Sequence, residues 1–207
     1  MRFALRYGKK AFKYGFLPLV IIAIMVVVSC NFPSHKKREK LKIDYGKIKV
    51  QLQSGDVILR AGTGLWSSAI KSRNLTDKRY SHVGVVKEVN RDFFIIHSEA
   101  NDFNGKGFVK EVSLEEFVNK STGIAISRLK TISPFEFLEN VELNLNKPFD
   151  WQFNRDEEES LYCTELIECA LRKINPNIRM QVVDNIIMPE SCLDTNLFQM
   201  IECYDFK

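Results

Sequence analysis

The chain has 207 residues, of which 45% are hydrophobic, so it is long enough for one domain with a sizeable core and too short for two typical ones. Its formal net charge of +4 arises at the N-terminus, because residues 1–30 hold five of the thirty basic residues and none of the twenty-six acidic ones. The rest of the chain then carries 25 basic and 26 acidic residues, a balance that argues against nucleic acid as a partner.

The first thirty residues have the layout of an export signal. Basic residues precede an uncharged stretch, and its apolar run 16–28 is shorter than the about 20 residues that span a bilayer. The run ends in Val27-Val28-Ser29-Cys30, which resembles the bacterial lipobox, in which the cysteine is lipidated and becomes the first residue of the mature protein. We therefore expect a lipoprotein signal peptide over 1–29; an uncleaved N-terminal anchor helix is the alternative.

The segment after Cys30 is polar and rich in charge, as expected of a tether between a lipid anchor and a folded body. This pattern divides the chain into the signal peptide, a lipidated cysteine with its tether over 30–48, and one folded domain over 49–207. The expected location is the bacterial cell envelope, with the domain held at a membrane through its lipid anchor.

Residues with high strand propensity predominate in the first half of the folded domain. The expected elements, in chain order, are a strand at 55–60, a short helix at 66–71, a polar loop at 72–79, and a hairpin of strands 81–89 and 93–97 joined by a turn at 90–92.

Helix signals become frequent in the second half. Ser113 with Glu116 three residues later is typical of a capping box, and Ser133-Pro134 is typical of a second helix start. The other expected elements are a turn at 101–107, strands at 108–112 and 123–129, a helix at 161–174 and a closing helix from 189. Strands clustered early with helices around them predict an α+β domain with an antiparallel sheet packed against helices.

The folded domain contains only two histidines, since His35 lies in the tether. If the hairpin loop is Arg91-Asp92, positions whose numbers sum to 183 pair, and His82, His97 and Glu99 share one face of the sheet. A slip of one residue would separate the two imidazoles. A histidine on a strand is by itself more often structural than catalytic.

Cys163 is the cysteine best placed for chemistry. Ser160 is a plausible N-cap, which would put Cys163 about three residues into the following helix, where backbone N–H groups favour a thiolate. Cys169 lies deeper in the same helix and is better interpreted as packing. Residue type alone would equally fit Cys163 as a small buried hydrophobe.

Several motifs taken together are more specific than any one of them. Their order resembles that of the permuted papain-like amidases of the YiiX/YaeF type, a branch of the NlpC/P60 superfamily related in plan to lecithin:retinol acyltransferase-like enzymes. The resemblance covers roughly residues 55–174 and rests on the segments Gly55-Asp56-Val57-Ile58, Ser81-His82-x-Gly84, Lys147-Pro148-Phe149-Asp150-Trp151 and Tyr162-Cys163-Thr164-Glu165. It implies a circularly permuted papain-like fold, with the histidine before the cysteine along the chain.

The resemblance implies roles for individual residues. Cys163 would be the nucleophile and His82 the base that accepts its proton. The third member of the family's site is often a glutamate, whereas the residue fifteen positions after His82 is His97; we favour His97, with Glu99 as the alternative. Tyr162 and Asp150 are motif neighbours that would either contact substrate or serve in capping and packing.

The expected activity is a cysteine hydrolase that cleaves amide bonds, in murein peptides or amino-acid conjugates, through an acyl-enzyme. Two alternatives remain open: a thiol acyltransferase or lipase acting on lipid esters, and a lipoprotein that binds ligands without catalysis. Since the histidines and cysteines lack the spacing of metal ligands, we expect neither a metal nor a cofactor.

Overall fold

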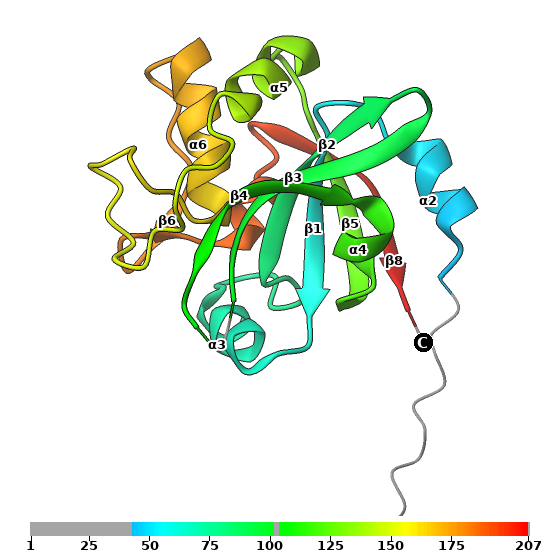
Figure 1. Cartoon of the computed structure of the whole chain (residues 1–207), viewed down its shortest axis with the longest axis horizontal. Coiled ribbons are helices and arrows are strands. Elements are labelled where there is room, and N and C mark those ends of the chain that lie inside the picture. The colour runs from blue at the N-terminus through cyan, green and yellow to red at the C-terminus, as the bar shows by residue number, and fades with distance from the viewer. Residues whose placement is uncertain (1–42, 102–103, 207) are drawn as a thin grey trace, which may run out of the picture. The chain divides into compact units, whose positions relative to one another are not determined.

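A computed structural model describes residues 43–101 and 104–206, and a six-stranded antiparallel sheet forms its centre (Figure 1). The strands lie in the order β4-β3-β2-β1-β5-β8. Their bounds are β1 Val57–Gly62, β2 His82–Val89, β3 Asp92–Ala100, β4 Gly107–Ser113, β5 Ser121–Leu129 and β8 Phe198–Asp205; β6 Val182–Val183 and β7 Ile186–Ile187 form a small separate hairpin.

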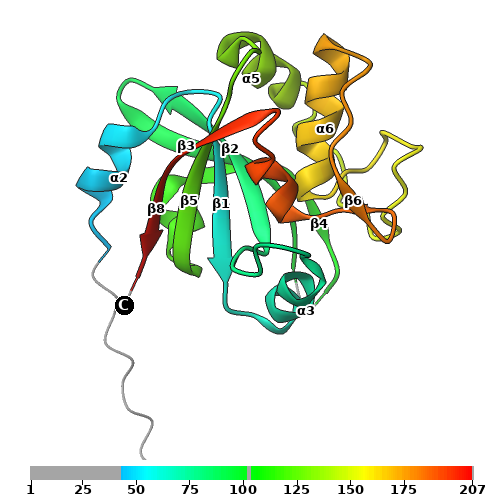
Figure 2. The same ribbon diagram turned by 180° about the vertical axis from the view of Figure 1, so that it is seen from behind.

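Helices cover the sheet and close its ends. They are α2 Tyr45–Gln51, α3 Leu65–Arg73, α4 Leu114–Val118, α5 Pro134–Glu142, α6 Cys163–Ile174 and the 3₁₀ helix η1 Pro189–Leu193. Figure 1 shows α5 and α6 together over one part of the sheet, and Figure 2 shows α2 beside β8 at the sheet edge. The predicted α+β class with an antiparallel sheet is confirmed.

The sheet has an apolar core on each face. Along β1 the side chains alternate, so that Val57 and Leu59 join the core beneath α5 and α6 while Ile58 joins the core that contains α4. Because both faces of β1 are covered, the strand is buried throughout and appears in the sequence as a nearly continuous apolar run, interrupted only by Arg60 and Gly62.

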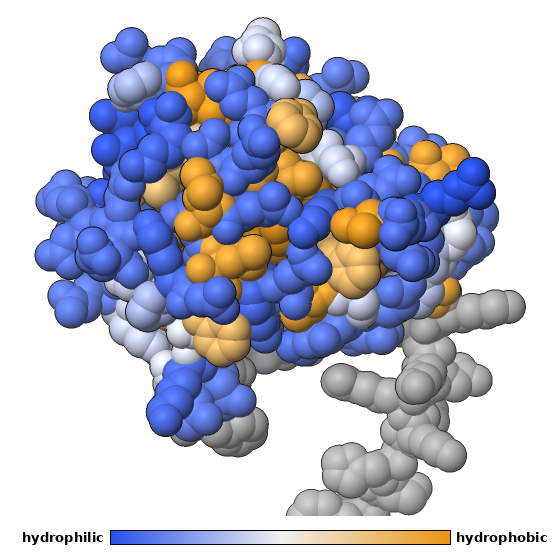
Figure 3. Space-filling model, turned by 45° about the horizontal axis from the view of Figure 1, so that its top comes forward, coloured by the Kyte–Doolittle hydropathy of each residue, from blue (hydrophilic) through white to orange (hydrophobic). Residues whose placement is uncertain are grey.

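The face of α5 and α6 that is turned forward in Figure 3 is largely hydrophilic, with apolar side chains in small patches. Phe135 and Leu143 are exposed apolar residues of the α5 region. Single exposed apolar residues of this kind are normal on protein surfaces.

The hairpin of β2 and β3 has a different register from the predicted one. Its loop is Asn90-Arg91, with φ of 53° and 73°, rather than Arg91-Asp92, and Val89 pairs with Asp92. Two successive positive φ values produce the tight turn whose twist suits a two-residue hairpin. The numbers of paired residues therefore sum to 181 rather than 183. Because this changes each residue's partner by two positions, every side chain stays on its predicted face of the sheet.

Serine caps begin two helices as predicted. The Ser113 hydroxyl accepts a hydrogen bond from the Glu116 backbone N–H, and that of Ser133 accepts one from Glu136, with Pro134 in the first turn. The side chains of Phe137 and Val141 are fully buried on α5.

The start of α6 differs from the prediction, because its N-cap is Tyr162 and not Ser160. The backbone N–H of Leu161 donates to the Pro148 carbonyl, which holds the chain extended before the helix. The Glu165 carboxylate then accepts the N–H of Tyr162. Cys163 is consequently the first residue of the helix rather than the third.

Two elements at the ends of the described chain were not predicted. Helix α2 begins at Tyr45, inside the segment assigned to the tether, and buries Ile48 in the core beside α4. Strand β8 adds the sixth strand along β5. The expected signal peptide and the expected lipidation site Cys30 lie outside the described residues, and among those described no helix has the length and apolar character needed to cross a membrane.

Candidate active site

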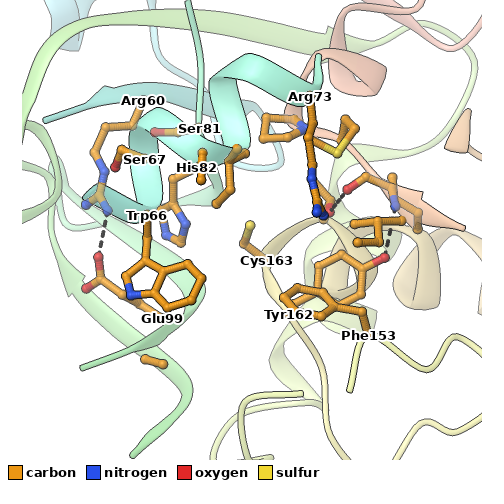
Figure 4. Close-up of a pocket in the computed structure, with 18 of the residues that line it drawn as sticks. Arg60, Trp66, Ser67, Arg73, Ser81, His82, Glu99, Phe153, Tyr162 and Cys163 are labelled. Atoms are coloured by element: carbon orange, nitrogen blue, oxygen red, sulfur yellow. Dashed lines mark hydrogen bonds and ion pairs between the residues drawn. The ribbon is translucent and has the colours of Figure 1, made fainter. Parts of the chain in front are cut away.

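Cys163 and His82 line the same pocket, which has a volume of about 480 Å³. Cys163 begins α6 and His82 begins β2, so the end of the sheet and the start of the helix meet there. In Figure 4 the Cys163 sulfur points into the space between α6 and His82. The fold thus brings together two residues that lie 81 positions apart in the sequence.

The Cys163 thiol is buried against backbone. Burial raises its pKa to about 11, although hydrogen bonds from the backbone N–H groups of Val83 and Thr164 act in the opposite direction. The contact with Val83 places the sulfur beside the residue that follows His82. At neutral pH the thiol is therefore protonated and needs a base to become a nucleophile.

His82 and His97 form a buried imidazole pair. Nε2 of His82 lies 2.8 Å from Nδ1 of His97, and the two rings are nearly perpendicular at a centroid distance of 5.0 Å. Burial lowers the pKa of His82 well below its usual value and that of His97 to about 3. Both rings are therefore neutral at pH 7, so that one nitrogen of the pair donates and the other accepts.

Phe117 and Arg60 complete the surroundings of His97. The Phe117 ring is perpendicular to that of His97 at 5.3 Å, and the Arg60 guanidinium lies 4.7 Å from the centroid of the same phenyl ring. Nε2 of His97 is buried without a hydrogen-bond partner in the described structure. If the proton of His97 is on Nε2, its Nδ1 is the acceptor for His82.

Glu99 lies on β3, the strand of His97, and its carboxylate forms ion pairs with three cations. Its carboxylate is 2.6 Å from Arg60, 3.0 Å from Lys120 and 3.4 Å from Lys110. Burial raises the pKa of Glu99, but the electrostatic interactions with the His82 ring and the Arg60 guanidinium, together with the hydrogen bond from Arg60, outweigh burial and lower it well below the usual range. Of the two candidates for the third member, His97 has the hydrogen bond to His82, while Glu99 provides a full negative charge nearby.

His82, His97 and Glu99 also resemble a metal-binding set, because one ligand atom from each lies within 4.8 Å of the others. The set fits a metal ion poorly. Three cations already contact Glu99, and His82 is already hydrogen-bonded to His97. A divalent ion would have to displace these partners, and the positive charges of Arg60, Lys110 and Lys120 would repel it.

Tyr162 and Asp150 occupy different positions. Tyr162 lines the pocket, where its hydroxyl accepts the backbone N–H of Ile187 and its ring packs on Phe153. Asp150 does not line the pocket; its carboxylate accepts the backbone N–H groups of Gln152 and Asn154 and so shapes the loop before α6. Asp150 thus stabilises the loop in this structure, and no helix begins at the residues that it contacts.

Most of the pocket wall is apolar and was not predicted. Trp66 and Trp151 meet edge to face at 6.4 Å, and both are exposed. The other apolar lining residues include Ile70, Phe149, Phe153 and Ile186. These residues come from α3, from the loop before α6 and from β7, so no local pattern groups them. The sequence could have indicated Arg60 as a site residue, since it is a charged residue within an otherwise apolar strand.

Glu165 is a buried carboxyl that should make stability depend on pH. Burial raises its pKa from 4.5 to about 8, and the nearby carboxylates Asp150 and Glu168 add to the shift. Because the folded state binds this proton more tightly than the unfolded state, its contribution is fully present below pH 4.5 and is lost as the pH rises to about 8.

We therefore expect Glu165→Gln to raise the melting temperature relative to the unaltered protein by several degrees at pH 8.5 and by much less at pH 4.5. Glutamine keeps an oxygen for the Tyr162 N–H, so the helix cap survives. Thermal unfolding at the two pH values checks this, and an equal effect at both would contradict it.

Comparison with known proteins agrees with this geometry. Residues 51–192 match the family described as permuted papain-like amidase enzyme, YaeF/YiiX, C92. Among solved structures, that of the metalloprotein yiiX from Escherichia coli O157:H7 is similar, with a TM-score of 0.61 and 16% identity over 73% of this chain and 97% of that one. No curated protein matches the chain. Because the family match spans well over half of the sequence, this chain belongs to the permuted papain-like amidases of the YaeF/YiiX type, which are cysteine-type amidases and peptidases with a papain-like fold.

Proposed function

We propose that the protein hydrolyses amide bonds with Cys163 as the nucleophile and His82 as the general base. The observation that carries this proposal is the placement of both residues in one pocket, with the Cys163 thiol against the backbone of Val83, next to His82. Neither residue type would suffice alone. A buried thiol of high pKa becomes reactive only where a neutral base can take its proton.

The reaction follows from these positions. His82 takes the Cys163 proton as the sulfur attacks the substrate carbonyl, and the backbone N–H of Cys163 at the start of α6 is positioned as a donor to the oxyanion. Collapse breaks the C–N bond, and His82 gives its proton to the departing amine. Water then attacks the thioester while His82 accepts a proton, which releases the acid and restores the thiol.

His97 orients His82 during these steps. It accepts the Nε2–H of His82, so that Nδ1 is the ring nitrogen of His82 left to take the proton of the thiol. Because His97 is neutral, the charge that stabilises the transient imidazolium comes from Glu99.

For the substrate we propose an amide in a peptide or amino-acid conjugate with an apolar portion. The aromatic and aliphatic pocket wall supports an apolar group, which Trp66, Trp151 and Phe153 would contact. The lipobox-like Val27-Val28-Ser29-Cys30 supports a lipid-anchored envelope protein, for which murein peptides are the accessible polymer. The same apolar wall favours the second candidate, a lipase or acyltransferase acting on lipid esters.

Product analysis separates the two candidates. The full-length protein is incubated with purified murein and, separately, with phospholipid vesicles, and Cys163→Ser serves as the control. We expect new peptide amino and carboxyl ends from murein that the serine variant fails to produce. Release of lysolipid without new peptide ends would replace the amidase proposal with the lipid-ester one.

A further inference from the structure

The charged residues that line the pocket are mostly basic. Three are cations and one is an acid: Arg60, Arg73, Lys120 and Glu99. Since His82 is neutral at pH 7, the lining carries a net positive charge. A pocket with apolar walls and one sign of charge attracts ligands of the opposite sign, because the low-dielectric walls focus the field.

Two of these cations already have a partner. Arg60 and Lys120 both contact the carboxylate of Glu99, at 2.6 and 3.0 Å. The carboxylate of Glu99 therefore partly neutralises the charges of Arg60 and Lys120, close to His82.

Arg73 is different, because throughout residues 43–101 and 104–206 no carboxylate lies within ion-pair distance of its guanidinium. It is the last residue of α3, where a cation is also favoured by the helix dipole. Lys71 in the same turn already donates to the Gly62 carbonyl at 2.6 Å. Arg73 is thus the pocket cation left available to a ligand.

The location of Arg73 indicates which part of a substrate it would meet. Figure 4 shows its side chain extending from α3 on the side of Cys163 where Tyr162 lies, whereas His82, Arg60 and Glu99 lie on the other side. The departing amine must lie beside His82, which protonates it. The acyl part of the substrate therefore extends away from His82, toward Arg73.

We propose that Arg73 selects amides whose acyl part carries a carboxylate, by pairing with that carboxylate inside the apolar pocket. A guanidinium binds a carboxylate through two parallel N–H donors, a geometry that lysine lacks. The inference rests on the proposed roles of Cys163 and His82, and it adds a determinant of specificity that those roles do not require.

Two alkylating reagents of nearly equal size test this directly on the full-length protein. Iodoacetate attaches a carboxylate to the Cys163 sulfur in the position of an acyl group, and iodoacetamide attaches a neutral amide. The rates are measured by mass spectrometry of the Cys163 peptide, at constant ionic strength and pH. The exposed thiol of Cys203, which does not line the pocket, is the internal reference for both reagents in the same sample.

We expect Arg73→Gln to lower the iodoacetate rate at Cys163 at least threefold and to leave the iodoacetamide rate unchanged, with Arg73→Lys retaining part of the preference. Lys78→Gln is the matched control, since it removes one positive charge from an exposed residue that does not line the pocket. The Arg73 effect should also shrink in high salt.

An unchanged ratio of the two rates in Arg73→Gln, or an equal change in Lys78→Gln, would overturn the proposal. The proposed function fails differently. If Cys163 reacts with iodoacetamide no faster in the unaltered protein than in His82→Ala, the catalytic roles are wrong, whatever Arg73 does to the ratio.

Discussion

Replacing His82 by alanine should lower the rate at which iodoacetamide alkylates Cys163 at pH 7 by about a hundredfold or more, the usual contribution of a general base. With its base removed, the reaction depends on free thiolate. A thiol whose pKa is about 11 is ionised to roughly one part in ten thousand at pH 7. The rate is followed by mass spectrometry of the Cys163 peptide, with Cys203 as the internal reference.

The pH dependence gives a second, independent signature of the same variant. In the unaltered protein both His82 and Cys163 are neutral across the middle of the pH range, because burial lowers the imidazole pKa and raises that of the thiol. Above the His82 pKa the rate should therefore stay level until the thiol begins to ionise near pH 11. In His82→Ala it should rise about tenfold per pH unit over the same range.

If the alkylation rate at Cys163 depended on pH in the same way in the unaltered protein and in His82→Ala, His82 would not be the base. Thermal unfolding of His82→Ala is the control, because the substitution removes the partner of His97 from a buried site. Cys169, which is buried in α6 away from the pocket, should react slowly in both proteins.

The hairpin shows what could be predicted of this site and why. Alternation along β2 and β3 assigns each side chain to a face, and that assignment survived a register shift of two residues. The shift itself depends on the positive φ values of Asn90 and Arg91, which residue type indicates only weakly. His82 and His97 are thus neighbours for the reason predicted, although their strands pair differently.

Two other features depend on contacts that no local pattern records. The start of α6 at Cys163 is determined by the hydrogen bond from Leu161 to Pro148 and by the carboxylate of Glu165, whereas Ser160 had appeared to be the better cap. The ion pairs of the Glu99 carboxylate are formed with Arg60 and Lys120, which lie 39 and 21 positions away in the sequence. Local propensity cannot predict such pairings, since they arise from the packing of β1, β3 and the turn before β5.

The third member of the site can be identified by comparing His97→Ala with Glu99→Gln. His97→Ala removes the acceptor of the His82 Nε2–H, so we expect the iodoacetamide rate at Cys163 to fall roughly tenfold to a hundredfold, the equivalent of one lost buried hydrogen bond. His97→Asn keeps an acceptor oxygen on a shorter side chain and should recover part of the loss.

Glu99→Gln should have the smaller effect. It keeps the size of the side chain and removes the negative charge among Arg60, Lys110 and Lys120, so the pKa of His82 falls further and the base becomes weaker without losing its orientation. Thermal unfolding measured on both variants separates this effect from loss of fold. If Glu99→Gln abolishes the reactivity of Cys163 and His97→Ala leaves it intact, the carboxylate is the third member, and the imidazole pair is a structural contact.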